Sequence, residues 1–118
     1  MADKVLRTKS FGLALRIVKL HRFFVDERKE YVLSKQLLRS GTSIGAMVRE
    51  AEQAESKADF VHKLAIGLKE AHESEYWIDL LNQSGYLEDE ACRSIRADLS
   101  EVVGLLTAII KTTKANLH

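Results

Sequence analysis

The sequence contains no proline, a single cysteine and no long uninterrupted apolar run. Because proline is the strongest helix breaker, its absence leaves glycine and capping residues as the main helix punctuation and favours long helices. Cys92 alone cannot form an internal disulfide, and no leader-like segment opens the chain, so we expect a cytoplasmic protein. No segment approaches the roughly twenty apolar residues that cross a bilayer, so we expect no membrane partner.

The chain of 118 residues has a length typical of one domain, and its 46% hydrophobic content is enough to fill one core. Its formal net charge of +1 argues against a disordered polyelectrolyte and against a strongly basic nucleic-acid binder. The charges are unevenly distributed, however. Residues 1–39 carry ten Lys or Arg against four Asp or Glu, whereas residues 40–101 carry six against thirteen.

Apolar residues recur at spacings of three and four in four segments. This period predicts helices over approximately 8–27, 30–55, 57–84 and 88–115. Ser10 is the expected N-cap of the first helix, Ser56 with Asp59 forms an imperfect capping box, and Gly85 is placed as a C-cap glycine would be. The charged residues 26–30 are the expected first connection, without core positions. Short connections enforce antiparallel neighbours, so the prediction is an all-α, antiparallel up-down-up-down four-helix bundle, with residues 1–118 as one domain.

Two glycines, Gly41 and Gly45, lie inside the second predicted helix. A glycine in a helix costs about 1 kcal/mol relative to alanine, so some other contact must offset that cost. Their four-residue spacing predicts a groove in which another helix packs closely, and a local bend of the helix is the alternative.

The sequence does not predict an enzyme, a metal site or a cofactor. A di-iron bundle needs two Glu-x-x-His pairs, and only Asp59-x-x-His62 approaches that spacing. No nucleophile elbow, phosphate-binding glycine-rich loop or Walker-type lysine is present, so we expect no catalytic residues.

One polar group does share a helix face: Glu70, Glu73 and Trp77 recur at i, i+3 and i+7. Paired carboxylates can perform general acid–base catalysis, but without a metal or nucleophile that interpretation is weak. We favour a network between the second and third helices that fixes their register. Its partners on the second helix would be Lys35, Gln36 and Arg39.

Several segments together resemble a known family. They are Leu33-Ser34-Lys35-Gln36-Leu37-Leu38-Arg39-Ser40, Thr42-Ser43-Ile44-Gly45-Ala46, Glu50-Ala51, Asp59-Phe60, and Lys69-Glu70-Ala71 with Glu73 and Tyr76-Trp77. The chain resembles the bacterial four-helix-bundle proteins encoded in intervening sequences of 23S ribosomal RNA genes, which are similar to the accessory variability protein (Avd) of diversity-generating retroelements. The resemblance implies a homopentameric, barrel-like ring and, for the retroelement relative, nucleic-acid binding and association with a reverse transcriptase. The sequence departs from the family pattern at Met47, where asparagine is common.

Two functions follow as hypotheses. The first is a self-assembling interaction protein, in which the oppositely charged surfaces of neighbouring copies meet head to tail; the alternative is a monomer with an idle surface. The second is an accessory protein that binds RNA or DNA. Its phosphate contacts would be Lys4, Arg7, Lys9, Arg16, Lys19, Arg22, Lys35 and Arg39. The same cations could instead be ordinary exposed residues, or could pair with the acidic half of a neighbouring copy.

Overall fold

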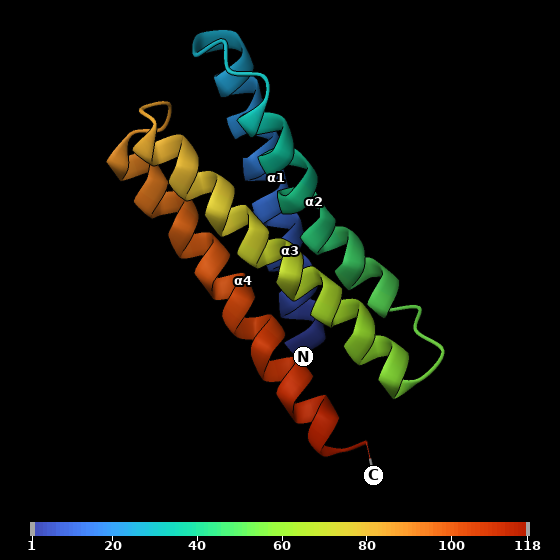
Figure 1. The fold of residues 1–118 in the computed structure, drawn as a ribbon. Coiled ribbons are helices and arrows are strands. Elements are labelled where there is room, and N and C mark those ends of the chain that lie inside the picture. The colour runs from blue at the N-terminus through green and yellow to red at the C-terminus, as the bar shows by residue number, and fades with distance from the viewer. Residues whose placement is uncertain (1, 118) are drawn as a thin grey trace.

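Four helices account for nearly all the residues that the structure describes. They are α1 (Ala2–Glu27), α2 (Leu33–Ala51), α3 (Lys57–Gln83) and α4 (Asp89–Ala115). The computed structural model describes the backbone of residues 2–117 and the side chains of residues 4–117. Each helix runs antiparallel to the one before it, and α1 and α4 also lie in contact, which closes a bundle of 50 × 21 × 20 Å (Figure 1). No strand occurs within residues 2–117, and the predicted all-α four-helix bundle is confirmed.

The first helix begins earlier than the sequence predicts. It starts at Ala2 rather than near residue 8, and Ser10 is not its N-cap. Ser10 is only 1% exposed on the core side of α1, where its hydroxyl donates to the carbonyl of Arg7 at 3.2 Å. Leu6 is also buried, so the apolar period extends one further turn toward the N-terminus. A serine inside the helix therefore satisfies its hydroxyl locally instead of capping the helix.

A buried carboxylate links α1 to α2. Residues 26–30 contribute no side chain to the apolar core, but Glu30 is buried as a polar residue. Glu30 is 7% exposed, and its carboxylate accepts the backbone N–H groups of Val32, Leu33 and Ser34 at 3.1, 3.0 and 2.7 Å. The Ser34 hydroxyl donates in return to the Glu30 carbonyl at 2.9 Å. Glu30 thus satisfies the free amides at the start of α2, so this helix begins at Leu33 rather than at residue 30.

The pKa of Glu30 reflects two opposing effects. Burial by itself raises the pKa, but the backbone hydrogen bonds from Leu33, Ser34 and Val32, with that of the Ser34 side chain, outweigh burial. The pKa of Glu30 therefore lies below its ordinary value.

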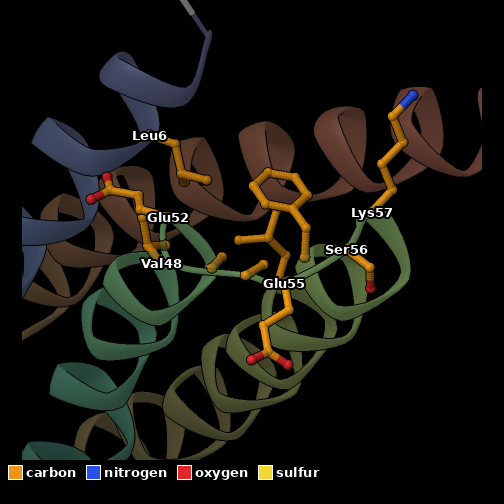
Figure 2. A pocket seen from close by; sticks show the side chains of 10 residues that line it. Leu6, Val48, Glu52, Glu55, Ser56 and Lys57 are labelled. Carbon is orange, nitrogen blue, oxygen red and sulfur yellow. The ribbon is translucent and has the colours of Figure 1, made fainter.

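The connection between α2 and α3 is longer than predicted, because α2 ends at Ala51 rather than near residue 55. The Ser56 hydroxyl caps α3 by accepting the amide of Asp59 at 3.0 Å. The Asp59 carboxylate accepts the amide of Glu55 at 3.2 Å, so the capping box closes one residue earlier than its usual form. This connection borders a cavity at one end of the bundle (Figure 2).

The third connection is a short turn that ends α3. Gly85 has a φ of 89°, the left-handed conformation that favours glycine just beyond a helix. The amides of Tyr86 and Leu87 both donate to the carbonyl of Leu81, at 2.9 and 3.1 Å. Leu87 is buried, and α4 begins two residues later at Asp89.

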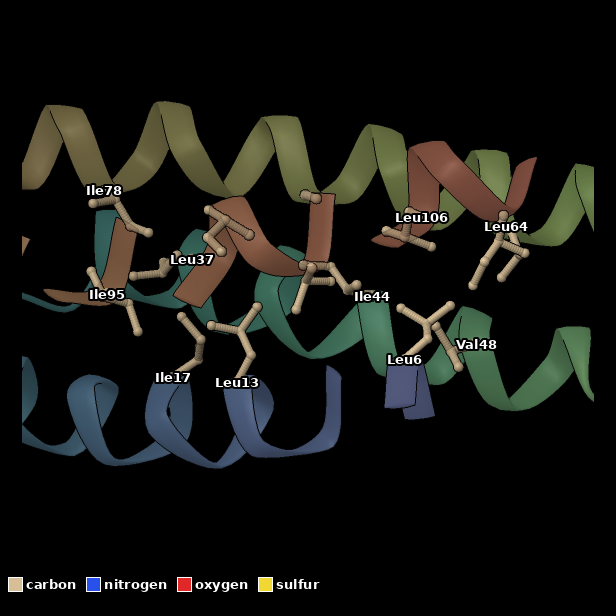
Figure 3. Packing of buried hydrophobic residues seen from close by; sticks show 14 of the residues in the cluster. Leu6, Leu13, Ile17, Leu37, Ile44, Val48, Leu64, Ile78, Ile95 and Leu106 are labelled. Atoms are coloured by element: carbon tan, nitrogen blue, oxygen red, sulfur yellow. The ribbon is translucent and has the colours of Figure 1, made fainter. Parts of the chain in front are cut away.

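All four helices contribute apolar side chains to one continuous core (Figure 3). The largest fully buried members are Leu6, Ile17 and Phe24 of α1, Leu37 and Ile44 of α2, Leu64, Ile78 and Leu81 of α3, and Ile95, Leu99, Val102 and Leu106 of α4. These positions follow the three-and-four spacing of the sequence, which is why periodicity alone predicts the fold class.

Replacing Glu30 by alanine is expected to lower the free energy of unfolding by about 1–2 kcal/mol, because three helix-terminal amides lose their acceptor. The pKa of Glu30 is lowered in the folded state, so its contribution is fully present above its ordinary value of 4.5 and is lost as the pH falls through the folded-state pKa. Urea unfolding followed by circular dichroism from pH 7 to pH 3 should show the difference between wild type and E30A shrinking. Glu27, exposed at the end of α1, supplies the control E27A. An equal loss in both variants would contradict the capping role.

Candidate functional site

A polar network bridges α2 and α3 and contains five of the six predicted members. The Arg39 guanidinium donates through Nη1 to Glu70 Oε2 at 3.0 Å and through Nη2 to Glu73 Oε2. The indole Nε1 of Trp77 donates to the same Glu73 oxygen at 2.8 Å, and Arg39 Nε lies 3.5 Å from Gln36 Oε1. The sixth predicted member, Lys35, is exposed and has no hydrogen bond or ion pair with any side chain within residues 4–117.

The ionisation of this network argues against a general-acid role for Glu73. The Trp77 hydrogen bond and the Arg39 guanidinium hold the pKa of Glu73 below its ordinary value, against a smaller opposing effect of burial. The Glu73 hydrogen bond in turn raises the pKa of Arg39. A general acid working near neutral pH needs a raised carboxyl pKa, so the direction of the Glu73 shift is the wrong one for that task.

A second polar contact, which was not predicted from the sequence, lies one layer deeper. The hydroxyls of Ser40 on α2 and Ser74 on α3 lie 2.8 Å apart, and both residues are fully buried. Ser74 also donates to the carbonyl of Glu70 at 2.9 Å. Each serine falls on the apolar side of its helix, where a polar residue needs a buried partner. That placement is the sequence signal that could have predicted the contact. Their small size lets α2 and α3 approach closely beneath the Arg39 network.

The two glycines of α2 lie against α1. A Cβ atom on Gly41 would lie 3.0 Å from two side-chain carbons of Ile17, which is too close without movement of that residue. A Cβ atom on Gly45 would meet the Ser10 carbonyl at 3.5 Å, an ordinary contact. Gly41 is therefore the more tightly packed of the two glycines against α1.

Half of the predicted phosphate-binding cations pair with carboxylates of the same chain. Three α1 residues do so at 3.5, 3.5 and 2.6 Å: Arg7 with Glu52, Lys9 with Glu101 and Arg16 with Asp98. Arg39 belongs to the network described above. The other four, Lys4, Lys19, Arg22 and Lys35, are exposed and lack a carboxylate partner among the described side chains.

The cavity beside the connection between α2 and α3 presents few polar groups that could act on a ligand. It has a volume of about 450 Å³ and lies at the end of the bundle where α2 connects to α3. Its floor is formed by buried apolar residues such as Leu6, Val48 and Leu64. Figure 2 shows the polar ends of Glu55 and Lys57 pointing away from the hollow rather than converging on it. This lining lacks the convergent polar groups that orient a substrate.

The described residues include no group of three or more His, Cys, Asp or Glu side chains placed to hold a metal ion. None of the four helices, over the residues described, is long and apolar enough to cross a membrane.

Comparison with known proteins identifies one family. The model of the 23S rRNA-intervening sequence protein family matches residues 3–108. A crystal structure of a protein of unknown function from the S23 ribosomal protein family of Bacteroides thetaiotaomicron VPI-5482 is 56% identical, with a TM-score of 0.93; the match covers 94% of this chain and 99% of that one. No curated protein matches the chain.

The contact between Arg39 and Glu73 is expected to contribute a measurable but small coupling. The Arg39 side chain is 49% exposed and that of Glu73 34%, so solvent screening limits the coupling energy to about 0.2–1 kcal/mol. A double-mutant cycle with R39M and E73Q, measured by urea unfolding, gives this value. The matched control cycle pairs K35M with E73Q, and we expect its coupling to be close to zero. A larger coupling for Lys35 than for Arg39 would contradict the arrangement.

Proposed function

Because the chain belongs to the 23S rRNA-intervening sequence protein family, we propose that it acts by assembling with copies of itself into a pentameric ring, without catalysing a reaction. The observation that carries this proposal is that α1 is apolar on two sides. Leu13 and Ile17 face the core, while Phe11 and Leu15, one turn apart, are 52% and 49% exposed. A helix with apolar residues on opposite sides is typically covered on both.

The family resemblance implies a pentamer, and the exposed apolar side chains of α1 favour assembly of any number of copies. Fully burying a side chain such as Leu or Phe stabilises a structure by about 1.5–3 kcal/mol, so covering Phe11 and Leu15 would favour association. Val5 and Phe23 add further exposed apolar surface to α1, at 44% and 36%. A surface of this kind on one helix is typical of a protein–protein contact.

Light scattering after size-exclusion chromatography is expected to give about five times the protomer mass for the wild-type protein at micromolar concentration. Dilution tests whether the assembly is reversible. A protomer mass at every concentration would contradict the proposal. A stable multiple other than five would retain self-assembly and reject the pentamer.

A second function is favoured by the unpaired cations, and we propose it as the alternative. Lys4, Lys19, Arg22 and Lys35 are free to contact phosphates, and an oligomer would present several copies of each. In this role the protein would be an accessory that binds structured RNA or DNA, alone or with a reverse transcriptase.

Binding to RNA and to DNA measured over a salt series tests the alternative. The double variant R22Q/K35Q is expected to bind more weakly, and its salt dependence should fall by about one counterion for each cation removed from a phosphate. The control K111Q/K114Q removes equal charge from the last turns of α4 and should bind as wild type does. No binding by the wild-type protein at low salt would reject this function.

A further inference from the structure

We propose that the hollow between α1 and α2 is the seat for Tyr76 of a neighbouring copy. The inference rests on the proposed self-assembly and names the two surfaces that meet in it. One surface is apolar with a cationic rim, and the other is an aromatic side chain flanked by carboxylates.

The hollow is open because small residues line it. Its volume is about 240 Å³, and its lining includes Ala14 of α1 with Thr42, Gly45 and Ala46 of α2. Phe11 forms one wall and is half exposed. Small side chains beside a protruding aromatic ring create a depression that can accept a single large side chain from another surface.

The rim of the hollow carries positive charge. The Arg49 guanidinium carbon lies 5.4 Å from the centre of the Phe11 ring, a cation–π arrangement that holds the guanidinium at the edge of the hollow. Arg49 has no carboxylate partner among the side chains of residues 4–117. Arg7 also lines the hollow, and its contact with Glu52 is 3.5 Å long. An occupant that brings apolar surface together with negative charge therefore fits best.

The same chain carries a side chain with these properties. Tyr76, at 58% exposure, is the one large apolar residue that α2, α3 and α4 expose within the described residues. Glu73 and Asp79 lie one turn before and one turn after it on α3. The Tyr76 ring packs edge-on against that of Trp77, with ring centres 5.0 Å apart.

The aromatic ring, more than the charges, would supply the binding energy. Glu73 already pairs with Arg39, and Asp79 lies 3.6 Å from Arg96 in its own copy. Additional cations from a neighbour would therefore add little, whereas a tyrosine transferred from water into a lined hollow is a common centre of binding energy. Because the hollow and Tyr76 are different surfaces, the contact is head to tail, and each copy retains a free surface for the next one.

Two arginine substitutions test the contact from its two sides. A46R fills the hollow, and Y76R removes the ring; both positions are exposed and helical, and arginine is a good helix former, so folding should be retained. Each variant alone is expected to have the mass of a single protomer. Mixed in equal amounts, they should form a heterodimer and nothing larger, because only the intact Tyr76 of A46R and the intact hollow of Y76R can meet. The control A97R makes the same change on the exposed side of α4 and should assemble as wild type does.

The outcomes separate this inference from the proposed function. A wild-type protein that is monomeric rejects both. If the wild-type protein assembles and A46R and Y76R assemble as well, this contact alone is rejected. The hollow would then be expected to bind a different acidic partner. Loss of assembly in both variants without heterodimer formation would also overturn the pairing, because it would show that the two surfaces do not meet each other. Circular dichroism of each variant verifies that the helices are retained.

Discussion

Close contact of α2 with both of its neighbours is the constraint on which the rest of the structure depends. Gly41 lets Ile17 of α1 approach α2 so closely that a Cβ atom at this position would lie only 3.0 Å from two Ile17 side-chain carbons. On the other side, the hydroxyls of Ser40 and Ser74 meet between α2 and α3 at 2.8 Å. Close packing of this kind on both sides of α2 resists a shift of one helix along the other. The register of α2 with its neighbours brings Arg39 beside the carboxylates of α3 and leaves the hollow beside Gly45.

Sequence periodicity predicted this architecture because the buried side of each helix carries apolar residues at regular spacing. The helix ends were harder to predict, since they depend on where individual polar side chains find partners. Ser10 has the chemistry of an N-cap but lies on the core side of α1 and bonds to the carbonyl of Arg7 within the same helix. Glutamate is usually a surface residue, but Glu30 is buried, and its carboxylate accepts hydrogen bonds from three backbone amides. Residue type alone does not distinguish these environments.

The same limit explains how much of the candidate site was predictable. Glu70, Glu73 and Trp77 were identified because helical spacing places them on one face, and Arg39 reaches that face from α2. Lys35 lies one turn from Arg39, but its side chain remains in solvent. The uneven distribution of charge along the sequence does not reveal which cations pair within the chain, and the structure does. Two cations of the basic N-terminal segment, Lys9 and Arg16, pair with acidic residues of α4, because α1 lies beside α4 in the bundle.

That internal pairing changes which surface remains for other molecules. Ion pairs such as that of Lys9 with Glu101 are about half exposed on both sides and contribute little stability, yet they neutralise charge that a neighbour or a phosphate would otherwise meet. The outward side of α1 still carries exposed side chains. Phe11 and Leu15 lie on the same side of this helix as Lys4 and Arg22, because the four positions are spaced by four or seven residues. Self-assembly and nucleic-acid binding would therefore draw on overlapping parts of one face. A copy seated on that face would cover the apolar residues and some of the free cations together, so a nucleic acid would have to bind along the edge of the assembly or compete with it.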